Sequence, residues 1–278
     1  MRNQELKLQK IEDVKQFLNQ INVKEAGVEF KRFSENGEHI FGIFDNKNVV
    51  GLADIEDDKD EAFFYVYIFS KYRKKGYGSA IIEIIEKQLE AKTVEIPYDF
   101  YNESVRKFLE KRGYIRSWAS TYMSYKGNKF DIPDLPIRNY EETDFENVYY
   151  FVDKAFHIMR LSTGWFPDSK LKDPDEESHK WYSDTKKDSF VYIVDNEIVG
   201  YVNLIEDEIN VVAIKNSNQG KGYGRLLTKY VTNVLIDRGF KEPTLWCVVN
   251  NKKARNLYDS LGYKEVCCVG FAKKKLEE

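Results

Sequence analysis

Two stretches of the chain carry the same succession of hydrophobic patterns. The segments "EAFFYVYIFSKY" and "DEINVVAIKNSN" are rich in β-branched and aromatic residues and end in polar ones, which is typical of β-strands. Each is followed by apolar residues at helical spacing, namely Ile81, Ile84, Ile85 and Leu89 in the first stretch and Leu227, Val231, Val234 and Leu235 in the second. The pattern therefore predicts a strand followed by a helix at both places, with Gly239 ending the second helix.

The residues further along the chain also correspond. Two short strand patterns, "KTVEIPYDF" and "PTLWCVVN", each lead into a helix pattern, "NESVRKFLEKRGY" and "NKKARNLYDSLGY". Asn102 and Asn251 are suitable N-caps for these helices, and Gly113 and Gly262 are suitable stops. A last strand pattern, "IRSWASTYMSY" or "KEVCCVGFAKK", closes each half. The shared order predicts a tandem duplication of one α/β (α+β) domain.

The boundary between the two copies is expected near "KGNKFDIPDLPIRN". Gly127, Asn128, Pro133 and Pro136 interrupt this stretch, and neither helical nor strand periodicity continues through it. The expected domains are residues 1–130 and 131–278, since the 278-residue length also suits two domains.

A glycine-rich loop lies between strand and helix in both halves. The loops are "RKKGYG" at residues 73–78 and "QGKGYG" at residues 219–224. A helix N-terminus offers unpaired amide groups and a favourable dipole to an anion, and glycine lets the backbone approach a phosphate closely. Neither loop has the Gly-Lys-Ser/Thr of a Walker loop or the third glycine of a dinucleotide fingerprint. The pattern favours a pyrophosphate-binding loop, and the alternative is a tight turn without a ligand.

These residues carry a resemblance to a known family. Arg or Gln followed by x-x-Gly-x-Gly, between a strand and a helix, resembles the acetyl-CoA-binding motif of the GNAT acetyltransferase superfamily. Asn251, Tyr258 and the "LGY" at residues 261–263 resemble the motif that follows it in that family. The resemblance covers most of both halves and is weakest over residues 1–40 and 145–190. It implies two tandem GNAT-like domains, each a mixed twisted sheet flanked by helices.

The resemblance also implies a cofactor, coenzyme A in the form of acetyl-CoA. The loop amides would hold its pyrophosphate, and the pantetheine arm would lie between two strands that splay apart. The residues that match the motif in the second half are Val212, Ala213, Ile214, Gln219, Gly220, Lys221, Gly222, Tyr223, Gly224, Arg225, Asn251 and Tyr258. A second site in the first half would use Arg73, Lys74, Lys75, Gly76, Tyr77 and Gly78.

The candidate proton donor and base lie in the second half. The resemblance implies that Tyr258 is the general acid, and a phenol is protonated at neutral pH and can donate to a departing thiolate. Alignment on Gly113 and Gly262 places Leu109 opposite Tyr258, and Ala62 stands opposite Glu208. Glu208 or a water molecule would take the proton of the attacking amine, with a backbone N–H near Val212 polarising the thioester carbonyl. The first domain is therefore expected to be degenerate and the second catalytic.

Composition excludes several other classes. The formal net charge of −3 argues against a general nucleic-acid binder, and no run of about 18 apolar residues indicates a membrane span. Three cysteines and three histidines without metal-ligand spacing predict neither a disulfide framework nor a metal site. The charged first residues do not form a secretory signal, so a cytoplasmic protein is expected. Cys247 lies in a strand pattern with no histidine nearby, which disfavours a covalent acetyl-cysteine route.

The acceptor is not identified by the sequence. In the family it binds largely between the first strand and the early sheet, here residues 156–184. That segment contains Trp165, Phe166, Trp181 and Tyr182, and the acidic residues Asp173, Asp175, Glu176 and Glu177 are among its polar ones. Such a lining suits a cationic amine, whether a small molecule or a peptide, although a solvated loop with core aromatics explains it too. The alternatives to an acetyltransferase are a coenzyme A sensor without transfer activity and a transferase of another acyl group. The sequence is compatible with either a monomer or a homodimer.

Overall fold

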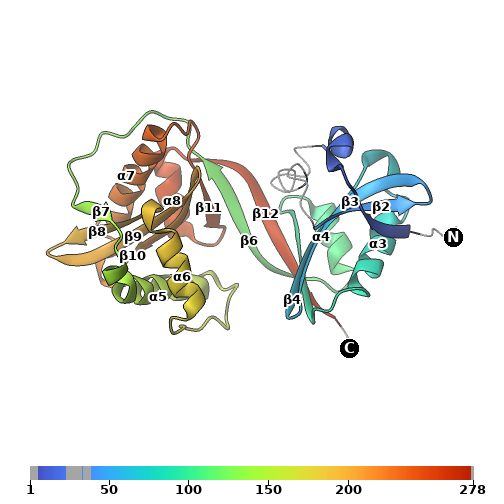
Figure 1. The fold of residues 1–278 in the computed structure, drawn as a ribbon, viewed down its shortest axis with the longest axis horizontal. Coiled ribbons are helices and arrows are strands. Elements are labelled where there is room, and N and C mark those ends of the chain that lie inside the picture. Colours follow the sequence, from blue (N-terminus) through green and yellow to red (C-terminus); the bar gives the residue numbers. More distant parts are fainter. Residues whose placement is uncertain (1–5, 23–32, 34–38, 277–278) are drawn as a thin grey trace. The chain divides into compact units, whose positions relative to one another are not determined.

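The computed structural model describes residues 6–22, 33 and 39–276, and Figure 1 traces the chain. The chain divides into two compact units. The first, called the N-terminal unit, contains residues 1–119 and 267–278, and the second, called the C-terminal unit, contains residues 120–266. Each is a mixed α/β unit with helices packed on a mixed sheet, as the repeated sequence patterns predicted.

The sheet of the N-terminal unit has the strand order β1-β2-β3-β4-β5-β12. Its strands are β1 (Leu6–Lys10), β2 (Ile40–Asp45), β3 (Asn48–Asp58), β4 (Glu61–Ile68), β5 (Thr93–Asp99) and β12 (Lys264–Lys275). Its helical elements are η1 (Val14–Gln20), η2 (Ser70–Tyr72), α3 (Tyr77–Glu86) and α4 (Glu103–Glu110). Strand β5 is parallel to β4 and antiparallel to β12, so this sheet is mixed.

Both faces of the N-terminal sheet are covered. On one face, Ile81 and Ile85 of α3 and Leu109 of α4 pack with Phe64 and Val94 of the sheet. On the other face, Val14 of η1 lies in a second cluster with residues of β3 and β4, including Leu52 and Tyr67. The alternation along each strand thus separates two cores, as expected for a sheet buried on both faces.

The sheet of the C-terminal unit has the order β6-β11-β10-β9-β8-β7. Its strands are β6 (Ile115–Ser124), β7 (Ile137–Asn139), β8 (Ser189–Val194), β9 (Glu197–Ile205), β10 (Glu208–Ile214) and β11 (Thr244–Val248). Its helices are η3 (Glu142–Asp144), α5 (Phe145–Thr163), α6 (Glu176–Asp184), η4 (Lys186–Asp188), η5 (Asn216–Asn218), α7 (Tyr223–Asp237) and α8 (Lys252–Leu261).

The C-terminal sheet also separates two cores. Leu227 and Val231 of α7 and Tyr258 of α8 pack on one face. Helices α5 and α6 pack on the other face through an aromatic cluster that includes Phe145 and Tyr182. Figure 1 shows α7 and α8 on one side of this sheet and α5 and α6 on the other.

The last strand of each half completes the sheet of the other half. Residues 269–275 of β12, near the end of the chain, pair with β5 from Val269↔Asp99 to Lys275↔Thr93. The end of β6, from the first half of the sequence, pairs with β11 from Ser120↔Val248 to Ser124↔Thr244. The units therefore exchange strands.

The exchange makes these units differ from the expected domains, 1–130 and 131–278. The linker composition marks where the connection between the halves runs, whereas strand pairing decides which sheet a strand completes. Within the described residues, no helix is both long enough and apolar enough to span a bilayer.

Candidate functional site

Each unit contains two parallel strands that pair only at one end. In the C-terminal unit, β10 and β11 pair at Glu208↔Thr244 and Ile209↔Leu245, and within the described chain their register ends there. In the N-terminal unit, β4 and β5 pair only from Glu61↔Thr93 to Phe63↔Glu95. Beyond these residues the two strands of each pair are no longer paired, and the space between their unpaired ends is called the opening of that unit. In the N-terminal unit a cavity lies there.

The glycine loops lie at the wide end of these openings. Gly76 (φ 91°) caps α3 and Gly222 (φ 87°) caps α7, both in the left-handed region that glycine adopts without strain. A Cβ on either glycine would meet no atom within 4 Å, so space lies beside the backbone. The first helical bonds of α7 run from the Arg225 and Leu226 N–H groups to the Gly222 carbonyl. The amides ahead of them are the donors that every helix leaves unpaired at its N-terminus.

The first residue of each motif braces its loop. Gln219 Nε2 donates to the Ile214 carbonyl at the end of β10, at 3.2 Å, and to Asn216 Oδ1 at 2.9 Å. Arg73 Nε donates in the same way to the Ile68 carbonyl at the end of β4, at 2.9 Å. Both side chains therefore fix the loop against the strand that precedes it.

The other motif residues of the C-terminal unit lie around the opening. Val212, Ala213 and Ile214 form the free end of β10, beyond a β-bulge between Ile209 and Val211. Gly220 and Lys221 are exposed, while Tyr223 packs edge-on against Tyr192 at 5.4 Å between ring centroids. Arg225 Nη2 donates to Ser260 Oγ of α8 at 2.7 Å. Asn251 caps α8 by accepting from the Ala254 N–H, as predicted.

Tyr258 and Glu208 occupy contrasting environments. Tyr258 is only 8% exposed and packs in one core cluster with Cys247 and Tyr263. Burial raises the pKa of this phenol, so Tyr258 is protonated at neutral pH. Glu208 is half-buried at the first residue of β10, where it still pairs with Thr244 of β11. The structure thus brings the phenol close to Cys247 and leaves Glu208 at the closed end of the opening.

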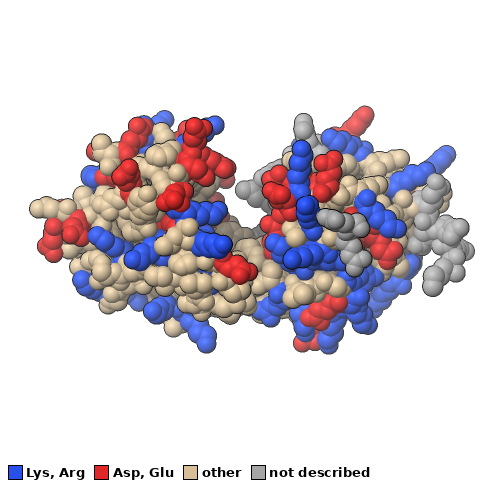
Figure 2. Space-filling model, turned by 90° about the horizontal axis from the view of Figure 1, so that it is seen from below, with Lys and Arg blue, Asp and Glu red and all other residues tan. Residues whose placement is uncertain are grey.

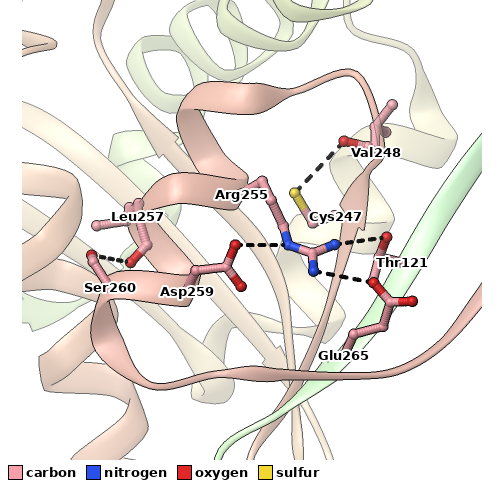
Figure 3. Close-up of polar contacts among 8 residues, drawn as sticks. All are labelled: Thr121, Cys247, Val248, Arg255, Leu257, Asp259, Ser260 and Glu265. Atoms are coloured by element: carbon pink, nitrogen blue, oxygen red, sulfur yellow. Dashed lines mark hydrogen bonds and ion pairs between the residues drawn. The ribbon is translucent and has the colours of Figure 1, made fainter.

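Arg255 links α8 to the exchanged strand within the C-terminal unit (Figure 3). Its Nε donates to Asp259 Oδ2 at 3.0 Å, Nη1 to Thr121 Oγ1 of β6 at 3.2 Å, and Nη2 lies 3.1 Å from Glu265 Oε2. One guanidinium therefore holds the helix that carries Tyr258 to the strand that came from the other half.

The N-terminal unit holds a cavity of about 620 Å³ at the corresponding place. The glycine loop, the separated ends of β4 and β5, and α4 line it, with Gly76, Tyr77, Gly78, Tyr98, Asn102 and Leu109 among the lining residues. Asn102 caps α4 by accepting from the Val105 N–H, as predicted. The sequence identified the loop of this unit but not the cavity or the contribution of Tyr98.

Family models match both units. The model described as "Acetyltransferase (GNAT) family" matches residues 155–263, and the model described as "Acetyltransferase (GNAT) domain" matches residues 36–116. The chain belongs to the GNAT acetyltransferase superfamily, as a tandem member. A search of curated proteins found no significant match.

Solved structures share the fold of this GNAT protein at low sequence identity. A GCN5-related N-acetyltransferase from Sphaerobacter thermophilus is 17% identical, with a TM-score of 0.69 over 90% of this chain and 86% of the other. A tandem GNAT protein from the clavulanic acid biosynthesis pathway is 12% identical, with a TM-score of 0.63 over 99% of both chains. An acetyltransferase of the GNAT family from Colwellia psychrerythraea is 15% identical, with a TM-score of 0.59 over 97% and 100%. These likenesses show a common fold.

Cys247, which packs in the same core cluster as Tyr258, is shielded from solvent. Cys247 is 3% exposed, and burial raises the pKa of its thiol to about 12. At neutral pH almost no thiolate is present, although the thiolate is the nucleophilic form. A buried, protonated thiol is not the form that would attack a thioester.

We expect Cys247→Ala to keep kcat for thiol release from acetyl-CoA within about threefold of the parent, since a thiol that stays protonated contributes no nucleophile. The measurement is steady-state kinetics together with mass spectrometry for an acetylated chain. An acetyl adduct on the parent that disappears in the variant, with kcat lost, would show the covalent route instead.

The segment expected to line the acceptor site is largely structural. Tyr182 is buried in the core under α5 and α6, and Asp175 caps α6 in a capping box with Ser178. His179 stacks on Phe145, with ring centroids 3.7 Å apart. Trp165, Phe166 and Trp181 are half-buried, and Asp173, Glu176 and Glu177 are exposed. The solvated loop with core aromatics accounts for most of this segment.

Proposed function

We propose that this GNAT protein transfers an acetyl group from acetyl-CoA directly to the primary amine of a small molecule or peptide, with the C-terminal unit as a catalytic centre. One observation carries the proposal: the unpaired amides at the start of α7 lie where β10 and β11 separate. An anion-binding helix end and a strand opening in one place suit a long ligand with a pyrophosphate at one end.

The proposed roles follow the chemistry of thioester aminolysis. The free edge of β10 near Val212 would offer a backbone N–H to the thioester carbonyl, where negative charge develops. Tyr258 would donate its proton to the departing thiolate, and its buried phenol is in the protonated form that this role needs. Glu208 or water would take the proton of the amine. The intact loop alone would also suit a coenzyme A sensor, so transfer has to be measured.

The test is Tyr258→Phe in a chain that also carries Gly78→Glu, which places a carboxylate in the N-terminal loop. We expect kcat for thiol release to fall about 100-fold, the usual scale of general acid catalysis, with the acetyl-CoA affinity kept. Hydroxylamine serves as the acceptor, because it is small and uncharged near neutral pH.

Tyr263→Phe in the same background is the matched control. Its hydroxyl is also buried in the C-terminal unit, but it bonds to Thr232 Oγ1 at 2.7 Å inside the core. We expect Tyr263→Phe to lower thermal stability and leave kcat nearly unchanged. Equal kcat values for Tyr258→Phe and its parent at every pH would remove Tyr258 from the scheme, and absence of acetyl-CoA binding would remove the proposed function.

A further inference from the structure

The N-terminal unit was expected to be degenerate because Leu109 stands where the other half has Tyr258. The structure gives this unit a cavity of about 620 Å³ at its glycine loop, and a phenol on a different element lines that cavity. The phenol belongs to Tyr98 of β5, whose side chain is 3% exposed. Among the described residues, no group hydrogen-bonds to the Tyr98 hydroxyl. A buried hydroxyl without a partner is costly, so its presence at a cavity points to a ligand that supplies the partner.

Three neighbouring positions differ together between the units. Alignment on Gly113 and Gly262 places Tyr98, Leu109 and Gly270 of the N-terminal unit opposite Cys247, Tyr258 and Thr121 of the C-terminal unit. Gly270 is the β12 residue that pairs with Tyr98, as Thr121 pairs with Cys247.

Glycine at position 270 makes room for the ring. A Cβ on Gly270 would lie only 2.7 Å from Tyr98 Cζ, which is closer than side chains allow. In the C-terminal unit the helix α8 carries the tyrosine and the strand β11 carries the small Cys247. In the N-terminal unit the strand β5 carries the tyrosine, Tyr98, and the helix α4 carries a leucine. The N-terminal unit thus has a phenol on β5 where the C-terminal unit has one on its helix, with a glycine opposite the ring that gives it room, which is unlike the simple loss of a site.

The N-terminal loop also carries more positive charge than its counterpart. It reads Arg73-Lys74-Lys75 before the first glycine of the Gly-Tyr-Gly, where the other loop reads Gln219-Gly220-Lys221. On the face displayed in Figure 2, lysine and arginine side chains gather over the N-terminal unit, on the right, with acidic residues among them. Cations beside unpaired helix amides favour a ligand that carries several phosphate charges.

We propose that the N-terminal unit is a second transfer site for an acyl-CoA thioester, in which Tyr98 takes the role of proton donor to sulfur. This inference rests on the proposed function, because it assumes the same aminolysis. The nucleophile's nitrogen forms a bond to the thioester carbon, the C–S bond breaks, and its electron pair stays on sulfur. The sulfur takes the Tyr98 proton, and the proton lost from nitrogen returns the phenolate to the phenol through water.

The surroundings of Tyr98 suit this role. Burial raises the pKa of its phenol, an effect that Glu110 and Cys268 reinforce and Arg116 and Arg106 oppose. Tyr98 is therefore protonated at neutral pH and can act as an acid.

The test uses the full chain with Gly224→Glu, so that only the N-terminal loop is open. We expect calorimetry to find one acetyl-CoA site in this variant. With hydroxylamine as acceptor, its rate of thiol release should exceed that of the Gly78→Glu/Gly224→Glu double variant. Adding Tyr98→Phe should lower kcat about 100-fold with Kd changed less than about threefold. The melting temperature should not fall, because the lost hydroxyl has no partner in the protein.

Tyr114→Phe is the matched control in the same background. Its buried hydroxyl donates to Glu86 Oε1 at 2.6 Å, so its loss should lower the melting temperature and spare kcat. Unchanged kcat in Tyr98→Phe, or binding without thiol release, would overturn the inference.

Binding results separate this inference from the proposed function. One acetyl-CoA site in the parent that disappears with Gly224→Glu would overturn the second site and leave the proposed function standing. No binding in the parent would overturn both.

Discussion

Gly224→Glu is expected to weaken acetyl-CoA binding to the C-terminal unit at least about 100-fold, or about 3 kcal/mol. Gly224 is the second residue of α7, where the unpaired amides attract the pyrophosphate. Two unit charges about 5 Å apart repel by about 3 kcal/mol at an effective dielectric constant of about 20, so one carboxylate there is sufficient.

The backbone and surroundings of Gly224 leave room for a side chain. A Cβ on Gly224 would lie 3.6 Å from Ile214 Cγ1, an ordinary contact, and the residue does not adopt a positive φ. Gly222, in contrast, has a φ of 87°, so a side chain there would strain the backbone and weaken binding for another reason. Gly224→Ala is therefore the control, with the same Cβ and no charge. We expect it to bind nearly as the parent does and to stabilise α7 by up to about 1 kcal/mol.

The same pair of substitutions at Gly78 tests the N-terminal loop. A Cβ on Gly78 would lie 3.5 Å from Phe108 Cζ, again an ordinary contact. Isothermal titration of the full chain should give two acetyl-CoA sites for the parent, one for either glutamate variant and none for the double variant. Equal weakening by alanine and glutamate would mean that steric fit, rather than charge, governs these loops, and unchanged binding in both glutamate variants would exclude the loops as phosphate sites.

Local features of the fold could be predicted from the sequence because they depend on neighbouring residues. Asn102 and Asn251 cap α4 and α8 as expected, and the two glycine loops each lead directly into a helix, as the sequence predicted. The strand, loop and helix order in each half is likewise a matter of periodicity within about 15 residues. Such features hold wherever the segment finally packs.

The strand exchange could not be predicted in this way. The pattern of β12 indicates which of its residues are buried, but β5 and β11 offer similar partners, so periodicity does not decide between the two sheets. Tyr98 was missed for a related reason. Its importance depends on Gly270, which lies far along the sequence and meets it only because β12 joins the N-terminal sheet.

Removal of residues 267–278 is expected to unfold the N-terminal unit and leave the C-terminal unit folded. The truncation removes the part of β12 that pairs with β5 and so exposes the edge of β5. It removes the buried side chains of Cys268, Val269 and Ala272 and the stack of Trp118 on Phe271, whose ring centroids are 4.1 Å apart. Burial of each large apolar side chain is worth about 1.5–3 kcal/mol, so the combined loss approaches the roughly 5–15 kcal/mol that stabilises a whole domain.

The C-terminal unit keeps its full set of strands in this truncation, because its exchanged strand β6 lies in the first half of the sequence. Hydrogen exchange should therefore show lost protection in α3 and β5 and retained protection in α7 and β11. Truncation after Leu276 is the control, since it leaves β12 whole. Acetyl-CoA stoichiometry should fall from two to one, with the remaining site sensitive to Gly224→Glu. Equal loss of protection in both units would mean that they fold as one cooperative body, and retained protection in β5 would mean that its sheet does not need β12.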